Sequence, residues 1–266
     1  MKRQTRRILF YTSIVLFMFF GYIAILYAQG YKYSFKDNRF VRTGAISLKV
    51  NTGASIYFND KLVGDTSFIT DAFSKGSLLP GRYTIKVSRE GYTTWQKKAV
   101  VEEGYLTDFP KIMILSESEE EVGKIIQEAS ATPTITPKPS KTPIPPPAGG
   151  STPKITEPYY LKNKILYKNN DVEPEIVAKN VLGFVLSKNE GIIGWWNNNN
   201  EVWVMWLKNT DYQPYHQTGD QELVTRFSTK IKNVSWFKDE DHVLVDSLGY
   251  KIVEIDTRGG VNIIKL

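Results

Sequence analysis

The chain has 266 residues, of which 41% are hydrophobic and 23% are charged, and its formal charge at neutral pH is +6. The chain contains no cysteine, which excludes disulfides, iron–sulfur clusters and cysteine zinc sites. Its only histidines, His216 and His242, are interpreted as loop or strand-end residues, so we predict no metal and no cofactor.

The positive charge is concentrated at the N-terminus. Four basic residues precede the first apolar run, and the rest of the chain carries a formal charge of only +2. That remainder lacks the dense basic stripe, interleaved with aromatic residues, that is typical of nucleic-acid-binding proteins. We therefore expect no nucleic-acid partner and attribute the basic residues to membrane topology.

Residues 8–27 form an uncharged apolar run of 20 residues. About 20 such residues are needed for a helix to cross a ~30 Å hydrocarbon core, so we predict a transmembrane helix embedded in the lipid bilayer. The alternative is a cleaved signal peptide, whose apolar core of about 7 to 15 residues precedes a small-x-small cleavage site. Tyr27 interrupts that pattern, and tyrosines cluster where their rings prefer the headgroup layer, at Tyr22, Tyr27, Tyr31 and Tyr33. We therefore favour an uncleaved anchor.

Basic residues also predict the orientation of this helix. The segment before the helix carries four basic residues, Lys2, Arg3, Arg6 and Arg7. The segment after the helix has only Lys32 and Lys36, and both lie further from it. The positive-inside bias then keeps the tail 1–7 in the cytoplasm and exports everything after the helix. The prediction is a single-pass cell-membrane protein whose bulk is extracytoplasmic, with a polar connector over residues 28–42.

Residues 43–116 alternate between apolar and polar side chains, as half-buried strands do. Turn residues separate the apolar runs, at Asn59 and Asp60, at Pro80 and Gly81, and at Glu90 and Gly91. This spacing predicts a small antiparallel β-sandwich. Its expected core residues are Ile46, Leu48, Val50, Ala54, Ile56, Phe58, Tyr83, Ile85 and Val87.

The same region resembles the PEGA domain family. The run GAISLKVNTGASIYFNDKLVG, followed by LLPGRYTIKVSREGYTTW, carries the family's ordered glycines and aromatic residues at Gly53-Ala54, Gly64, Leu79-Pro80-Gly81, Gly91-Tyr92 and Trp95. Asn51 and Thr52 replace the Pro-Glu of the family's name. The resemblance implies a β-sandwich of bacterial and archaeal surface or envelope proteins, and it brings no catalytic residue with it.

Residues 117–154 have the composition of a linker. An acidic stretch that can form a short helix comes first, and eight prolines follow between residues 131 and 154. Proline favours extended polyproline II, which at ~3.1 Å per residue gives this spacer a reach of up to roughly 70 Å. Its serines and threonines beside proline would suit O-glycosylation, although we favour an unmodified spacer.

Residues 155–266 contain an internal repeat. Lys179-Asn180-Val181 and Lys232-Asn233-Val234, which are 53 residues apart, each open a passage that predicts four antiparallel strands. KILYKN and EIVAKN look like the last two strands of a preceding unit. These two and a half repeats resemble β-propeller blades, and SWFKDEDHVLV is similar to the opening of TolB-type blades.

The strand over residues 201–207 is apolar on both faces, so it must be covered on both sides. A propeller needs at least about four blades to close, and this array is therefore expected to be incomplete. The chain would continue, pair with a second copy as an oligomer, or pack as an open sheet. The predicted fold is all-β apart from one N-terminal transmembrane helix, with a PEGA-like sandwich and an incomplete propeller-like array.

No nucleophile elbow, P-loop, HExxH or dinucleotide fingerprint is present, and adjacent carboxylates at residues 239–241 are interpreted as turn residues. Trp195 and Trp196, beside an Asn-rich turn, could contact a glycan, but core packing is the favoured alternative. We assign no catalytic residue.

These features predict a membrane-anchored, extracytoplasmic, non-catalytic binding or scaffolding protein of the cell surface or envelope. Its expected partner is a protein or a cell-wall or surface polysaccharide. Two alternatives stay open: the non-catalytic part of an exported propeller-containing hydrolase or lyase, and a membrane-bound sensor component.

Overall fold

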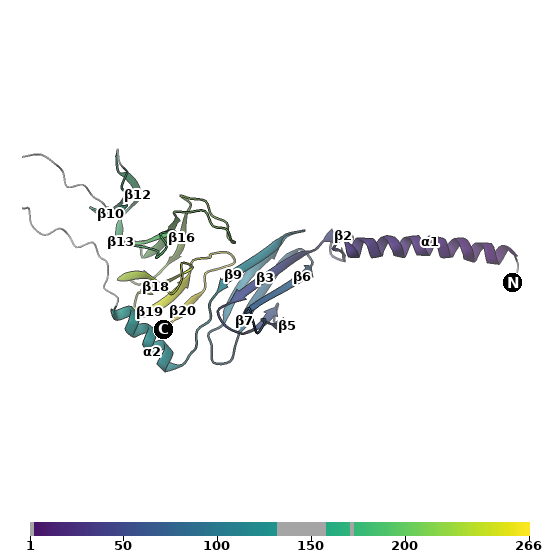
Figure 1. Ribbon diagram of the computed structural model, residues 1–266, viewed down its shortest axis with the longest axis horizontal. Helices are drawn as coiled ribbons and strands as arrows, with labels where there is room; N and C mark the ends of the chain where they lie inside the picture. The colour runs from purple at the N-terminus through teal and green to yellow at the C-terminus, as the bar shows by residue number, and fades with distance from the viewer. Residues whose placement is uncertain (1–2, 132–157, 171–172) are drawn as a thin grey trace, which may run out of the picture. The chain divides into compact units, whose positions relative to one another are not determined.

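The computed structural model describes residues 3–131, 158–170 and 173–266 (Figure 1). The chain divides into two compact units. The first unit comprises Met1–Arg89 and Lys98–Ile114, and the second comprises Glu90–Lys97 and Leu115–Leu266. Most of the predicted proline-rich linker lies outside the described residues.

The first element is the apolar helix α1 (Arg3–Ala28), and none of its residues is buried. Apolar side chains are exposed on all sides of α1, whereas a helix that packs on a protein core buries one side. Its 26 residues span about 39 Å at ~1.5 Å per residue. By length and composition α1 can therefore cross a bilayer, a property that it shares with signal sequences. The predicted helix over residues 8–27 is confirmed, and it begins earlier than expected.

Residues 28–42, expected to form a polar connector, contain a β-hairpin. Strand β1 (Tyr31–Ser34) pairs antiparallel with β2 (Arg39–Arg42). The backbone N–H and the hydroxyl of Thr43 both donate to the carbonyl oxygen of Gly30, at 2.8 Å and 2.7 Å. These bonds close the base of the hairpin directly after the helix.

Two sheets form the predicted sandwich, in the strand orders β6-β3-β9 and β5-β4-β7-β8. The expected inward-facing residues Ile46, Leu48, Ile56, Ile85 and Val87 have no exposed surface, which confirms the alternation. The strands are β3 (Gly44–Val50), β4 (Ser55–Phe58), β5 (Lys61–Asp65), β6 (Ala72–Leu78), β7 (Gly81–Ser88), β8 (Trp95–Val101) and β9 (Leu106–Ile112).

The sequence pattern predicted an antiparallel sandwich, and this prediction is wrong for one pair of strands. β3 pairs with β9 in parallel, with Leu48 opposite Phe109. Parallel neighbours need a long crossover, and here the chain between β3 and β9 visits the other sheet. Periodicity identifies each strand but not the direction of a partner so distant in sequence. The hairpin turn at Asn59 and Asp60 is confirmed, because both residues have positive φ, 49° and 64°.

The short helix expected in the acidic stretch is present as α2 (Glu119–Ala131). The hydroxyl of Ser118 accepts a hydrogen bond from the backbone N–H of Glu121, as an N-cap residue does. Three glutamates occupy the first turn, where negative charge suits the helix dipole. This local chemistry explains where the helix begins.

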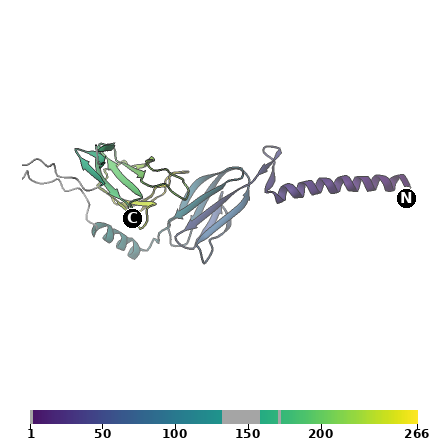
Figure 2. The ribbon, with the colours of Figure 1, turned by 45° about the horizontal axis from the view of Figure 1, so that its top comes forward.

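Three sheets in which consecutive strands are neighbours follow, in the orders β10-β11-β12, β13-β14-β15-β16 and β17-β18-β19-β20. They are drawn in green to yellow in Figures 1 and 2. The predicted strands are confirmed, and β10 was not predicted. None of these sheets closes into a barrel or a propeller. The strands are β10 (Tyr159–Lys162), β11 (Ile165–Lys168), β12 (Glu175–Lys179), β13 (Val181–Leu186), β14 (Ile192–Asn197), β15 (Glu201–Trp206), β16 (Gln221–Arg226), β17 (Asn233–Trp236), β18 (His242–Asp246), β19 (Tyr250–Glu254) and β20 (Ile263–Lys265).

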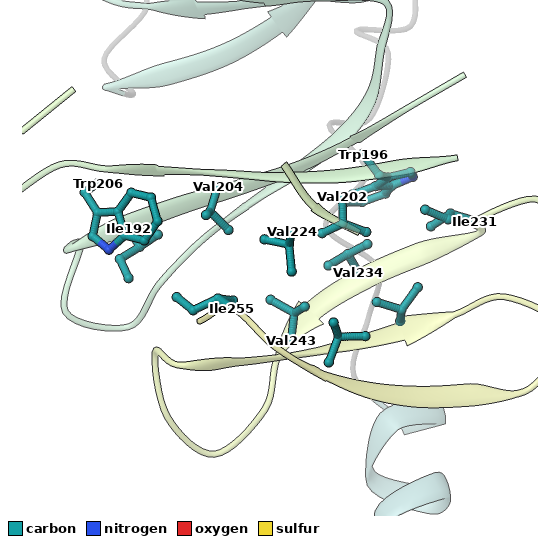
Figure 3. Packing of buried hydrophobic residues seen from close by; sticks show 12 residues of the cluster. Ile192, Trp196, Val202, Val204, Trp206, Val224, Ile231, Val234, Val243 and Ile255 are labelled. Carbon is teal, nitrogen blue, oxygen red and sulfur yellow. The ribbon is translucent and has the colours of Figure 1, made fainter. Parts of the chain in front are cut away.

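The middle sheet, β13 to β16, is covered on both faces. Val202, Val204 and Trp206 pack with residues of β17 to β19 (Figure 3). On the opposite face, Trp195 and Met205 pack with residues of β10 and β11. This arrangement confirms the prediction that strand 201–207 needs cover on both sides, and it makes the three sheets a face-to-face stack.

Candidate binding site

Three connections of the second unit meet at one end of its sheets. They are the β13–β14 turn (residues 187–191), the β15–β16 loop (207–220) and the β17–β18 turn (237–241). The first two leave the same end of the middle sheet because its strands are antiparallel. The third joins them through Glu240 Oε1, which accepts a hydrogen bond of 3.0 Å from the backbone N–H of Asn189.

A pocket of about 170 Å³ lies among these connections. That volume is below the roughly 300–1,000 Å³ of sites that enclose drug-sized ligands, so the pocket fits one side chain or one sugar-sized group of a larger ligand. Most of its lining residues have polar side chains, and Ile192 and Trp206 come from the core. The lining residues are Asn189, Gly191, Ile192, Trp206, Lys208, Asn209, Thr210, Asp211, Tyr212 and Glu240.

A hydrogen-bond network holds the carboxylates of the β17–β18 turn. The hydroxyl of Tyr212 donates to Asp241 Oδ1 at 2.7 Å, and Asp239 Oδ1 lies 3.0 Å from Nδ1 of His242. Residues 239–241 lie in the turn between β17 and β18, as expected. Asp241, however, is only 9% exposed, so its carboxylate is largely shielded from solvent. Burial raises the pKa of Tyr212, and the Asp241 carboxylate raises it further. Tyr212 is therefore a permanent donor that fixes the loop to the turn.

The long loop is also fastened by a ring stack. The His216 and Trp206 rings are nearly parallel, at 9°, with centroids 3.4 Å apart. Burial lowers the pKa of His216, which favours the neutral imidazole in this stack, while nearby carboxylates, Glu222 first, oppose that shift. Its location in a loop agrees with the sequence interpretation, as does that of His242, the first residue of β18. The loop is thus a positioned wall of the pocket.

The Asn-rich turn at the other end of the middle sheet is locked by Glu201. The side-chain amide of Asn197 donates to Glu201 Oε2 at 2.6 Å, and the indole N–H of Trp203 donates to the same oxygen at 3.1 Å. Arg226 forms an ion pair with the other carboxylate oxygen. These hydrogen bonds, led by that of Asn197, lower the pKa of Glu201 to about 2. The turn is braced internally.

Trp195 and Trp196 lie in the core. Each is 3% exposed, and they belong to the two different core clusters on either side of the middle sheet. A Cβ atom at Gly183 would lie 2.4 Å from the Trp196 ring, so a glycine is needed beneath it. The Trp195 ring stacks on that of Trp203 with centroids 6.2 Å apart. Their burial agrees with core packing, the alternative favoured from the sequence, and neither indole exposes a face on which a sugar could stack.

A buried ionic network lies within the second unit, between the segment Glu90–Lys97 and β19. Lys97 Nζ is 3.1 Å from Glu254 Oε1, and the side chains of these two residues are 0% and 6% exposed. The indole N–H of Trp95 donates to Glu254 Oε2 at 3.0 Å. Burial raises the pKa of Glu254, whereas the Lys97 ammonium lowers it. The network covers the face of β19 that points away from the core of the stack.

The residues predicted to orient the helix are only partly described. Arg3, Arg6 and Arg7 lie in the first turns of α1 and are exposed, and Lys2 lies outside the described residues. Sequence reasoning did not identify Tyr212, Asn189 or Lys208 as site residues. Polar residues in unrelated loops carry no spacing signal, and only the stacking of the sheets brings them together.

No curated protein matches the chain. The model of the PEGA domain family matches residues 46–111, which run from β3 to β9, so this part of the chain is similar to PEGA domains.

Proposed function

We propose that the chain is a membrane-anchored, extracytoplasmic protein that binds or scaffolds a partner and has no catalytic activity. The observation that carries this proposal is α1, an apolar helix without a buried residue placed ahead of two β-rich units. The match to the PEGA domain, a non-catalytic domain of surface type, supports the exported location.

Retention of the helix is supported by its contacts. Tyr27, in the last turn of α1, packs edge-to-face on Phe40 of β2 with ring centroids 6.2 Å apart. Gly30, just after the helix, accepts two hydrogen bonds from Thr43. A cleaved signal peptide contributes nothing to the mature fold, whereas the end of α1 is part of the first unit. Arg3, Arg6 and Arg7 support a cytoplasmic N-terminus.

The second unit is interpreted as an open, propeller-like stack of blades. Sheets made of consecutive antiparallel strands, stacked face to face, support this interpretation. Trp95 and Lys97 already cover the outer side of β19, so a further blade on that face would have to displace them. The proposed contact surface is the end of the stack where the β13–β14, β15–β16 and β17–β18 connections meet, which we call the loop end. The proposed partner is a protein or a cell-wall or surface polysaccharide.

The absence of catalysis is supported by how the carboxylates at the loop end are used. Asp239, Glu240 and Asp241 each hold another part of the network through hydrogen bonds. General acid–base chemistry needs a group directed at a substrate. These side chains instead position the loops.

A topology experiment tests the anchor. A reporter that is active only outside the cytoplasm, fused after Leu266, should be active, and the chain should stay in the membrane fraction with an intact N-terminus by mass spectrometry. A soluble chain that begins after α1 would overturn the anchor.

A binding experiment tests the loop end. With purified peptidoglycan as the probe, Lys208→Ala combined with Asp211→Ala should reduce co-sedimentation of the chain, because both residues line the pocket. Lys188→Ala, at an exposed position in the β13–β14 turn outside the lining, is the matched control. Equal co-sedimentation of all variants would remove peptidoglycan as the partner.

A further inference from the structure

The β1–β2 hairpin is fixed to the end of α1. The helix ends at Ala28, and β1 begins at Tyr31, with Gly30 at φ 83° making the bend between them. Gly30 also accepts both bonds from Thr43, which follows β2 directly. The hairpin therefore cannot move far from the end of the helix, and both views show it beside that end (Figures 1 and 2).

Four aromatic side chains form a continuous row from the helix into the hairpin, and we call it the aromatic row. Tyr27 contacts Phe40 at 6.2 Å between ring centroids, Phe40 contacts Tyr33 at 5.4 Å, and Tyr33 contacts Phe35 at 5.1 Å. All three contacts are edge-to-face, the geometry that aromatic pairs prefer. The row ends at Phe35, which is 87% exposed.

The level of the row follows from its first member. Tyr27 is the last residue of the uncharged run 8–27, so in a helix that spans the bilayer it lies where hydrocarbon meets headgroups. The Phe40 ring, which contacts Tyr27 directly, lies at the same boundary, and the row leads from Phe40 through Tyr33 to Phe35. Moving a phenylalanine side chain from water into an apolar environment is favourable by roughly 1.5–3 kcal/mol. Insertion of Phe35 at the boundary of the bilayer would gain part of this free energy.

The hairpin also carries basic side chains, as is common where a protein meets headgroups. Lys36 and Arg42 are exposed, and Arg39 is held by Glu103 at 3.2 Å. Aromatic rings at the hydrocarbon boundary with lysine or arginine beside them are typical of interfacial segments. The hairpin therefore has the chemistry of a membrane-surface element.

We propose that the β1–β2 hairpin lies in the headgroup layer of the membrane that holds α1, with the Phe35 end of the aromatic row inserted into lipid. This inference rests on the proposed anchor and adds a second contact with the bilayer. The occupant of the exposed aromatic surface is phospholipid of the same membrane. Its consequence is that the first β unit begins at a defined height and orientation at the membrane surface.

Site-specific spin labelling tests this placement, because the chain has no cysteine and one introduced cysteine is unique. Phe35→Cys carries the label in the full chain, reconstituted into vesicles of phosphatidylcholine with phosphatidylglycerol. Phe68→Cys is the matched control, since Phe68 is a phenylalanine that is 100% exposed in the β5–β6 loop. Lys32 Nζ donates a hydrogen bond of 2.8 Å to the carbonyl oxygen of Ser77, so the hairpin lies beside the C-terminal end of β6. The β5–β6 loop lies at the other end of β6, and at ~3.3 Å per residue these two ends are about 17 Å apart.

The label at residue 35 should be accessible to oxygen and protected from a water-soluble nickel chelate, while the label at residue 68 should show the reverse. Equal access of the nickel chelate to both labels, in chains that float with the vesicles, would overturn the hairpin placement and leave the anchor standing. Failure of the intact chain to float with the vesicles would overturn the anchor itself, and with it the placement.

Discussion

The hydroxyl of Tyr212 donates a hydrogen bond of 2.7 Å to Asp241, which joins the long β15–β16 loop to the turn of the neighbouring sheet. The two residues lie in different sheet connections, so this bond shapes the pocket without belonging to either local motif. It links the stacking of the sheets to the form of the candidate binding surface.

Removing that donor should loosen the loop end. Tyr212→Phe leaves the Asp241 carboxylate, which is 9% exposed, without this partner, and we expect a loss of about 1–3 kcal/mol in the free energy of unfolding. Urea titration of the full chain in detergent measures the loss. Tyr215→Phe, at a position 70% exposed in the same loop, should leave stability within about 0.5 kcal/mol. An unchanged Tyr212 variant would show that the bond does not hold the loop.

The two buried tryptophans should behave as core residues. Trp195→Ala and Trp196→Ala each remove a ring from a packed cluster and should cost about 3–5 kcal/mol of unfolding free energy. Thermal unfolding by circular dichroism measures the cost, and Leu248→Ala, at an 81% exposed position, is the control. Variants that keep full stability but lose binding to a polysaccharide would instead restore the glycan-contact hypothesis.

Glu201 should make stability depend on acidic pH. Its hydrogen bonds lower its pKa from 4.5 to about 2, so its stabilising contribution is complete above pH 4.5 and is lost as the pH falls toward 2. This contribution is on the order of 2 kcal/mol. It is smaller than the full pKa shift implies, because the Arg226 guanidinium is exposed and solvent screens its charge. Glu201→Gln should therefore be less stable than wild type at pH 6, and the difference should shrink toward pH 2.5. Glu190→Gln, at an exposed turn position, should track wild type throughout, and parallel curves for all three proteins would contradict this assignment.

The Lys97–Glu254 pair should be costly to break on one side. Lys97→Met removes the ammonium beside a buried carboxylate and should destabilise the chain by about 3–5 kcal/mol, whereas adding Glu254→Gln, which removes the charge and keeps an acceptor for the Trp95 indole N–H, should recover most of the loss. Loss of the ammonium raises the pKa of Glu254 further, so the deficit of Lys97→Met should be smaller near pH 5 than near pH 8. Urea unfolding at both pH values provides the measurement. Lys98→Met, exposed at the next position of the same strand, should be close to neutral, and an equally large effect there would refute the role of the buried pair.

Local sequence signals predict most strands of this protein. Alternating apolar residues such as Ile46 and Leu48 define strands because side chains point to opposite faces in succession. The turn at Asn59 and Asp60 follows from the tolerance of these residues for positive φ. The first sheet of the stack was harder to predict, because β10 has only four residues and follows a proline-rich stretch.

Local patterns in the sequence are enough to predict the apolar helix, the PEGA-like run and every strand of the stack except β10, because each of these depends on neighbours within a few residues. Three features depend instead on tertiary contacts: the parallel pairing of β3 with β9, the packing of Trp95 and Lys97 within the second unit, and the meeting of Asn189, Tyr212 and Glu240 around a pocket. These features join residues that are far apart in the chain. Their pairing depends on which buried faces and polar groups satisfy one another, and a periodic pattern does not record that choice.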